Sequence, residues 1–389
     1  MRFTSFHLMP YRQLDQKRAY AERSSWVVLS NELYDPKVGA DEYESYIDHL
    51  ARGEELGFDV IAVNEHHQTA YGMMPAPNLI ASALIQRTKR VKIAIIGRAL
   101  PLVSNPLAIA EEFAMLDNMS RGRIITGFVR GIGSEYHSTG VNPTFSHERF
   151  HEAHDLILQA WTKPGPTQFD GDHYNFRYVN IWPRVYQNPH PEIWIPSQGS
   201  TETIQWASDP ARRYPFMVTF ASEESVIRYL NMYRDAARRH GYEAKGSQLG
   251  WAMPVYVADT DEQAIAEATE GAETLFNLYL SQTVEMLLPP GYMSIESFTR
   301  TMKMRGKQLM APRTATMKGL MDSGTVVAGS PKTVRERIAR MQDATGLENI
   351  IAMLQFGTMP DHLARRSMEM FAAEVMPHFQ DKVRTAAAE

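Results

Sequence analysis

The chain has 389 residues, of which 44% are apolar and 22% are charged, an ordinary composition for a globular protein. It contains no cysteine, which excludes disulfides, zinc–thiolate sites, iron–sulfur clusters and thiol nucleophiles. The net charge is −5, and acidic and basic residues are interspersed along the chain. We therefore expect neither nucleic acid nor an anionic membrane as a partner. We find no secretory signal and no apolar run that could span a membrane, and we expect a cytoplasmic protein.

Strand and helix patterns alternate along the chain, which is typical of parallel βα units in one sheet. Eight segments have the apolar character of buried parallel strands: residues 3–8, 58–64, 91–97, 123–129, 192–198, 214–220, 250–258 and 349–356. No G-x-G-x-x-G motif follows the first strand, which disfavours a doubly wound open sheet. We therefore predict an α/β chain, residues 1–389, folded as one (β/α)8 TIM barrel with insertions.

The helices between these strands have clear start signals. Residues 41–56 carry an apolar stripe at helical spacing. Asn105 and Pro106 have the residue types of an N-cap and a first helical residue, and Ser330 and Pro331 repeat this pattern later in the chain.

Two stretches do not fit the regular alternation. Residues 162–191 are rich in Pro, Gly, Asn and aromatic residues, and we predict an irregular excursion there. Residues 280–324 form an insertion before the last strand, and we interpret it as a candidate lid. It contains seven of the 22 methionines: Met286, Met293, Met302, Met304, Met310, Met317 and Met321. The alternative is that these are core residues of an extra helical pair.

Polar residues at the end of the second strand are the first candidates for a site, because active sites of barrels lie at the carboxyl ends of strands. Asn64, Glu65, His66 and His67 stand there in succession. Side chains alternate along a strand, so His66 shares a side with Asn64 and away from Glu65. His66 could move a proton near neutral pH. A metal site formed by Glu65, His66 and His67, or purely structural histidines, are the alternatives.

A second candidate is an anion site after the fifth strand. Gly199, Ser200 and Thr203 open a helix whose free N–H groups and hydroxyls suit a phosphate. Arg130, at the end of the fourth strand, could add a charged grip. The simpler alternative is that Ser200 only caps the helix.

With these motifs in place, the chain resembles the bacterial luciferase-like family of flavin-dependent monooxygenases over nearly its whole length. The segments that carry the resemblance are residues 57–67, 105–112, 116–123, 329–331 and 367–377. The resemblance implies a barrel that binds reduced FMN supplied by a separate NAD(P)H:flavin reductase. With O2, it would oxygenate a small organic substrate through a flavin C4a-peroxide. Family members often dimerise, so we also expect a homo-oligomer.

The resemblance also assigns roles to individual residues. His66 matches the family's site histidine, which assists proton transfer near the flavin. Gly97 and Arg98 fall where the family's third strand passes beneath the flavin ring, often through a cis peptide. Three further positions match those that contact the phosphate: Arg130, Ser200 and Thr203. The expected cofactor contacts also include Asn64, Gln198 and Gly199.

The chain departs from luciferase at two of these places. Val129 stands where luciferase has a cysteine before the arginine, which weakens any expectation of light emission. Gly199 stands where luciferase has an acidic residue, so the contribution of Gln198 stays open.

Three alternatives remain at this level. A relative of the same fold could use the deazaflavin F420 for hydride transfer, a barrel hydrolase could use a metal, and a non-catalytic relative could bind FMN only. The substrate is not specified by the sequence. Four aromatic residues could line its pocket, although each fits core or rim at least as well: Phe6, Tyr71, Trp182 and Trp251.

Overall fold

The computed structural model describes residues 1–310 and 313–380. Eight parallel strands pair in a closed ring, in the order β1-β2-β3-β4-β7-β8-β9-β11, and β11 pairs with β1. They are β1 Arg2–Phe6, β2 Val60–Val63, β3 Lys92–Ala99, β4 Ile124–Val129, β7 Glu192–Ser197, β8 Phe216–Thr219, β9 Leu249–Val257 and β11 Asn349–Met353. Each lies within one of the eight predicted segments or overlaps it closely, so the (β/α)8 barrel is confirmed. A short strand that was not predicted, β10 Val327–Gly329, pairs with β9 outside the ring.

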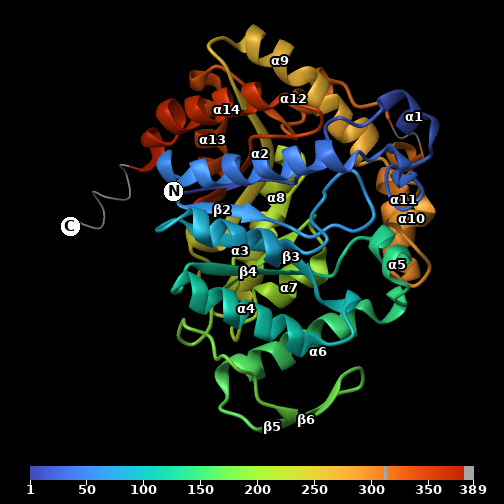
Figure 1. Ribbon diagram of the computed structural model, residues 1–389, viewed down its shortest axis with the longest axis vertical. Helices are drawn as coiled ribbons and strands as arrows, with labels where there is room; N and C mark the ends of the chain where they lie inside the picture. Colours follow the sequence, from blue (N-terminus) through green and yellow to red (C-terminus); the bar gives the residue numbers. More distant parts are fainter. Residues whose placement is uncertain (311–312, 381–389) are drawn as a thin grey trace.

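Helices surround the barrel between successive strands (Figure 1). The main ones are α2 Pro36–Glu55, α3 Pro77–Arg87, α4 Pro106–Ser120, α6 Ser146–Thr162, α7 Thr201–Ala207, α8 Glu223–Arg239, α9 Asp261–Thr274, α13 Pro331–Thr345 and α14 Asp361–Met370. Two short helices, α1 Gln16–Ala21 and α5 Gly133–Thr139, follow β1 and β4. No helix in the described ranges is long and apolar enough to cross a membrane.

The helix starts predicted at Asn105 and Ser330 are confirmed by their caps. Asn105 Oδ1 accepts a hydrogen bond from the N–H of Leu107 at 3.1 Å, directly before Pro106 in α4. Helix α2 begins at Pro36, earlier than the predicted residue 41. The Asp35 side chain accepts from the N–H of Lys37, so Asp35 and Pro36 use the same cap that was recognised at Asn105.

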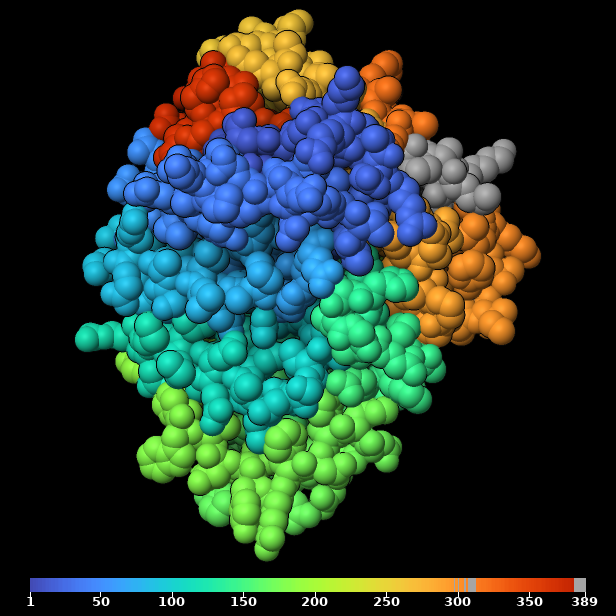
Figure 2. Space-filling view, turned by 45° about the vertical axis from the view of Figure 1, so that its right-hand side comes forward, coloured from blue at the N-terminus to red at the C-terminus, as the bar shows by residue number. Residues whose placement is uncertain are grey.

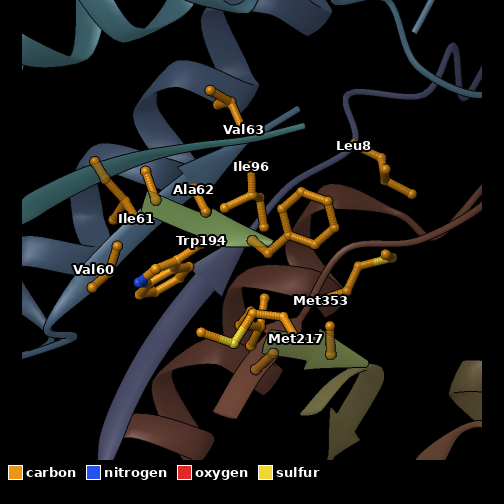
Figure 3. Packing of buried hydrophobic residues seen from close by; sticks show 14 of the residues in the cluster. Leu8, Val60, Ile61, Ala62, Val63, Ile96, Trp194, Met217 and Met353 are labelled. Atoms are coloured by element: carbon orange, nitrogen blue, oxygen red, sulfur yellow. The ribbon is translucent and has the colours of Figure 1, made fainter. Parts of the chain in front are cut away.

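The inside of the barrel is filled by large side chains from some strands and small ones from others. The register sets Ala62 beside Ala94, Ile96 beside Gly127, and Gly127 beside Trp194. Figure 3 shows Ile96, Trp194, Met217 and Met353 packed in this core. Arg2 and Glu192, on opposite strands of the ring, form an ion pair at 3.0 Å near the amino ends of the strands. The core therefore leaves the carboxyl ends as the place for a site.

The excursion at residues 162–191 is more regular than predicted. It contains an antiparallel hairpin, β5 Thr167–Asp170 with β6 Asn175–Val179, at the bottom of Figure 1. The aromatic residues Phe169 and Phe176 are paired across it.

The insertion before β10 holds three helices, α10 Val284–Leu287, α11 Ile295–Met310 and α12 Met317–Asp322. Helices α10 and α11 lie beside α1 and α5, on the side of the barrel away from the chain termini, whereas α12 lies near α9 and α14 (Figure 1). Met286 and Met317 are buried, with 7% and 4% of their surface exposed. The side chains of Met304 and Met310 lie outside the described part. The buried methionines thus serve to pack this insertion onto the barrel.

Candidate active site

His66 lies at the carboxyl end of the barrel with both ring nitrogens hydrogen-bonded. Asn64 Nδ2 lies 2.9 Å from Nε2, as expected for two residues on the same side of the chain. On the other side of the ring, Nδ1 lies 2.9 Å from Oε1 of Glu135. Glu135 belongs to the third position of α5 and was not among the predicted residues. The only sequence signal for it is an acidic residue in the first turn of a short helix after β4.

Glu65 and His67 point to a different set of partners. Glu65 Oε1 lies 2.7 Å from His67 Nε2, and Glu65 Oε2 lies 2.9 Å from Arg98 Nη1. The pKa of His67 is raised, chiefly by the hydrogen bond to Glu65. Glu65, His66 and His67 therefore do not converge on one point as the metal alternative required. Within the described ranges, no group of three or more His, Asp or Glu side chains could hold a metal ion.

Two aromatic rings hold the His66 ring in place. Trp26 lies edge-on to it at 5.2 Å between ring centroids, and Tyr71 lies at 4.9 Å. Trp26 is fully buried, and its Nε1 donates to the carbonyl of Tyr279 at 2.6 Å. Sequence reasoning missed Trp26, because the loop after β1 has no periodic pattern.

The other aromatic residues considered for a substrate pocket lie elsewhere. Phe6 pairs with Met353 on the inner face of the barrel. Trp251 is fully buried on β9, whereas Trp182 is 83% exposed in the excursion before β7. Of the four, only Tyr71 contacts His66.

Gly97 forms a bulge in β3, where the register with β4 shifts between Ile96 and Arg98. Its φ of +125° is strained for any residue with a side chain. A Cβ built there would contact Val129 and Asn64 at 3.6 to 4.0 Å, so the bare backbone of Gly97 faces the same space as Asn64. The cis peptide often found here in the family is absent, since the cis bonds of the described chain all precede prolines.

Arg98, a predicted cofactor contact, forms an ion pair with Glu65 in this structure. It is 9% exposed and paired with the buried Glu65. The bulge at Gly97 turns the Arg98 side chain to the outer side of the strand, where it holds Glu65 and, through it, His67. Arg98 is thus a structural ion-pair partner in this structure.

Arg130 lies at the end of β4 and is held by the insertion. Its Nη1 donates to Ser146 Oγ at 2.9 Å and to the carbonyl of Tyr292 at 2.7 Å. The guanidinium also lies 3.9 Å from the centre of the Tyr292 ring, and the Tyr292 hydroxyl donates to the carbonyl of Gly131. Tyr292 therefore joins the insertion to the end of β4, where Arg130, the predicted phosphate-binding residue, lies.

Ser200 caps α7, as the simpler alternative required. Its Oγ accepts from the N–H of Thr203 at 3.4 Å and donates to Glu202 at 2.8 Å. Gly199 has a φ of +100°, and a Cβ there would overlap the ring of Tyr229. Gln198 is exposed.

His147 connects the two halves of the predicted phosphate site. Its pKa is lowered to about 4 by burial and then by the Arg130 guanidinium, while Glu202 acts in the opposite direction. His147 at the start of α6 is thus within electrostatic reach of the end of β4 and the start of α7. In the described ranges, the hydrogen bonds of Arg130 do not reach Ser200 or Thr203.

Backbone strain is concentrated around this end of the barrel. Four non-glycine residues in the loops after β1, β2 and β8 have positive φ: Met9, Val27, Gln68 and Phe220. Val27 is β-branched, for which φ of +62° is unfavourable, yet its N–H donates to the carbonyl of Gln68 at 2.8 Å. Such strain persists where the surrounding structure fixes the backbone, and it clusters at functional sites.

The fold and these strand-end residues define a barrel enzyme with a histidine beside a bare glycine bulge. Residues 23–348 match the model of the luciferase-like monooxygenase family. The chain therefore belongs to this family and is an oxidoreductase.

Among similar proteins, the alkanal monooxygenase alpha chain of Photobacterium leiognathi is 24% identical over 369 residues. The match covers 91% of this chain and 99% of that one. The oxygenating constituent of 3,6-diketocamphane monooxygenase from Pseudomonas putida, a type II Baeyer–Villiger enzyme solved with FMN, has a TM-score of 0.74 at 19% identity. That match covers 97% of this chain and 98% of that one. An F420-dependent secondary alcohol dehydrogenase has a TM-score of 0.65 at 17% identity, over 97% and 98% of the two chains.

Proposed function

We propose that the protein binds reduced FMN at the carboxyl end of the barrel and uses O2 to oxygenate a small organic substrate. Family membership supports the class of reaction. The observation that carries the site is the glycine bulge at Gly97, which presents flat backbone next to Asn64 and close to His66. As the resemblance to the family implies, a separate NAD(P)H:flavin reductase would supply the reduced cofactor.

The residues present fit such a cofactor at both of its ends. Arg130 offers a cation, and the amino end of α7, which Ser200 caps, offers the positive end of a helix for a phosphate. At the ring end, Oδ1 of Asn64 is buried and has no hydrogen-bond partner, so it is free to accept from a polar edge of a ring. Gln198 and Gly199 directly precede Ser200 in the chain. Reduced flavin, when bound, supplies the electrons that activate O2.

His66 and the insertion have separate tasks in this proposal. His66 holds or accepts a proton at Nε2 beside the ring position. The insertion at residues 280–324 acts as the lid that excludes water, since an activated oxygen species is lost to hydrolysis in an open site. Tyr292 fixes the lid to the Arg130 end of the cofactor.

The phosphate end can be tested without knowing the substrate. Reduced FMN, reduced riboflavin and reduced F420 are titrated into the apoprotein under anaerobic conditions. We expect FMN to bind most tightly. Arg130→Met should weaken FMN about 10- to 100-fold, the value of one charged hydrogen-bonding group, and leave riboflavin unchanged. The matched control is Arg177→Met, at an exposed arginine in the hairpin β5–β6.

Two outcomes would count against the proposal. Tighter binding of F420 than of FMN would instead support hydride transfer with F420, a reaction that does not use oxygen. An equal loss of FMN and riboflavin in Arg130→Met would show that Arg130 supports the fold around Tyr292 rather than a phosphate.

A further inference from the structure

We infer that Glu135 is the positioning residue that fixes which nitrogen of His66 carries a proton; the inference rests on the proposed role of His66 in proton transfer. Glu135 is almost completely buried, with 3% of its side chain exposed, and lies 2.9 Å from His66 Nδ1. Its second oxygen, Oε2, accepts from the N–H of Ile132 at 2.9 Å. Both carboxylate oxygens are therefore committed, and the group cannot turn away from His66.

The chemistry of the contact assigns the proton. A carboxylate can only accept hydrogen bonds, so His66 Nδ1 must carry the hydrogen in this pair. Asn64 Nδ2 can only donate, so Nε2 accepts from it in the neutral ring. Nε2 is thus the one nitrogen that can gain or lose a proton, and it is the nitrogen on the side of Asn64 and the Gly97 bulge.

The Asn64 amide can form a hydrogen bond with Nε2 of His66 whether or not that nitrogen carries a proton. In the structure its Nδ2 faces Nε2 and its Oδ1 is buried without a partner. When Nε2 gains a proton, rotation of the amide brings Oδ1 to accept it, and Nδ2 then takes the opposite place. An amide with one unused oxygen beside a histidine is suited to both states of the ring, whereas a carboxylate at this position would favour only one.

The backbone around Glu135 keeps its carboxylate in place. Gly131 has a φ of +81°, and a Cβ there would lie 3.2 Å from Glu135 Oε2. Helix α5 is tied to the loop that follows His66, because Gln68 Nε2 donates to the carbonyl of Ser138 at 3.1 Å. Trp26 and Tyr71 hold the plane of the ring, so the task left to Glu135 is the choice of tautomer.

The test is the tautomer of His66 in the apoprotein, read by nitrogen-15 NMR of histidine-labelled protein at mildly alkaline pH. His66→Gln identifies the His66 signals by their loss. In the wild-type protein we expect a hydrogen on Nδ1 and none on Nε2. In Glu135→Gln the amide can accept or donate, so a mixture of both tautomers should appear. Glu135→Asp keeps a carboxylate and should restore the wild-type pattern at least in part.

The companion readout is the reaction of the reduced flavin complex with oxygen. A positioned proton-transfer group contributes about 100-fold or more to a rate, and Glu135→Gln should lose a large part of this, about 10-fold or more, while reduced FMN binds as before. Glu42→Gln, at another buried glutamate that pairs with Arg12, is the matched control. Unchanged tautomer signals in Glu135→Gln would overturn the inference. A shifted tautomer in a protein that binds no FMN would uphold it and reject the proposed function instead.

Discussion

At the scale of single residues, the neighbouring histidines His66 and His67 are separated by their partners. The carboxylate of Glu65 pairs with both His67 and Arg98. His66 instead joins Asn64, on its own strand end, to Glu135, which comes from α5. Both histidines lie in the loop after β2, which ends at Val63, so the separation is fixed by these tertiary contacts and not by strand pairing.

This separation gives a direct prediction for the two histidines. His66→Gln should lower the rate of oxygenation about 100-fold or more, the usual loss when a proton-transfer group is removed. The dissociation constant of reduced FMN should change little, because Gln can still pair with Asn64. His67→Gln is the matched control at the adjacent position. Rapid-reaction kinetics with anaerobic binding data check the split, and an equal loss of binding and rate in His66→Gln would argue against a proton-transfer role.

Part of this site was predictable from the sequence. The sequence pattern placed Asn64 and His66 on the same side of the chain, and the structure joins them at 2.9 Å, although β2 already ends at Val63. Glu135 is 69 positions further along the chain, and only the closed barrel brings it to His66. Arg98 was assigned to the cofactor through the resemblance to the family; its ion pair with Glu65 depends on the bulge at Gly97, which the sequence pattern does not show.

At the scale of secondary structure elements, the insertion is joined to the site through α5. Helix α10 approaches α5 so closely that a Cβ on Gly133 would lie 2.1 Å from the carbonyl oxygen of Leu287. The rings of Tyr136 and Tyr292 also meet edge to face at 5.6 Å. Figure 2 shows the α5 segment, in green, between the N-terminal segment in blue and the insertion in orange. A movement of the insertion would therefore shift α5, the helix that contains Glu135.

The lid proposal is tested at Met286, which is buried on α10. Met286→Ala removes packing worth about 2 to 5 kcal/mol and should loosen the insertion locally. Reduced FMN should still bind, but the share of oxygen released as hydrogen peroxide in place of product should rise at least about twofold. Met115→Ala, at a methionine 52% exposed on α4, is the control. Unchanged peroxide release in Met286→Ala would show that the insertion is no lid.

The elements themselves were largely predictable, for physical reasons. Buried parallel strands are continuous apolar runs, and such runs stand out in a sequence. Short elements were missed: β10 has three residues, and α5 has seven. Neither is long enough to show a period, and both depend on tertiary contacts for their conformation. The early start of α2 was available from Asp35 and Pro36, whose residue types form an N-cap.

At the scale of the whole molecule, stability should depend on two buried histidines outside the site. His7 and His49 meet at 5.3 Å between β1 and α2, and both are almost fully buried. Burial lowers the pKa of His7 and lowers that of His49 from 6.5 to about 4. His7 Nδ1 accepts from the N–H of Met9, which suits a neutral ring.

Acid should therefore weaken the fold within a defined window. Below pH 6.5 the unfolded chain binds a proton at His49 that the folded chain does not bind until about pH 4. The free energy of unfolding therefore has its full value above pH 6.5 and falls as the pH drops from 6.5 to about 4. The loss that is due to His49 is on the order of 3 kcal/mol. Urea unfolding from pH 7 to 4 measures the slope. His49→Gln should reduce this slope, to which His7 and His147 also contribute, and the exposed His362→Gln should not; an equal slope in His49→Gln would contradict the assignment.

The proposed function requires that this barrel hold reduced FMN and pass its electrons to O2 in a closed site. The most direct measurement is stopped-flow absorbance of the anaerobic complex of protein and reduced FMN mixed with oxygenated buffer. We expect a transient species, distinct from reduced and oxidised FMN, that outlives the oxidation of free reduced FMN and decays faster in Met286→Ala. Direct conversion to oxidised FMN, at the rate of the free cofactor and without a transient, would contradict it.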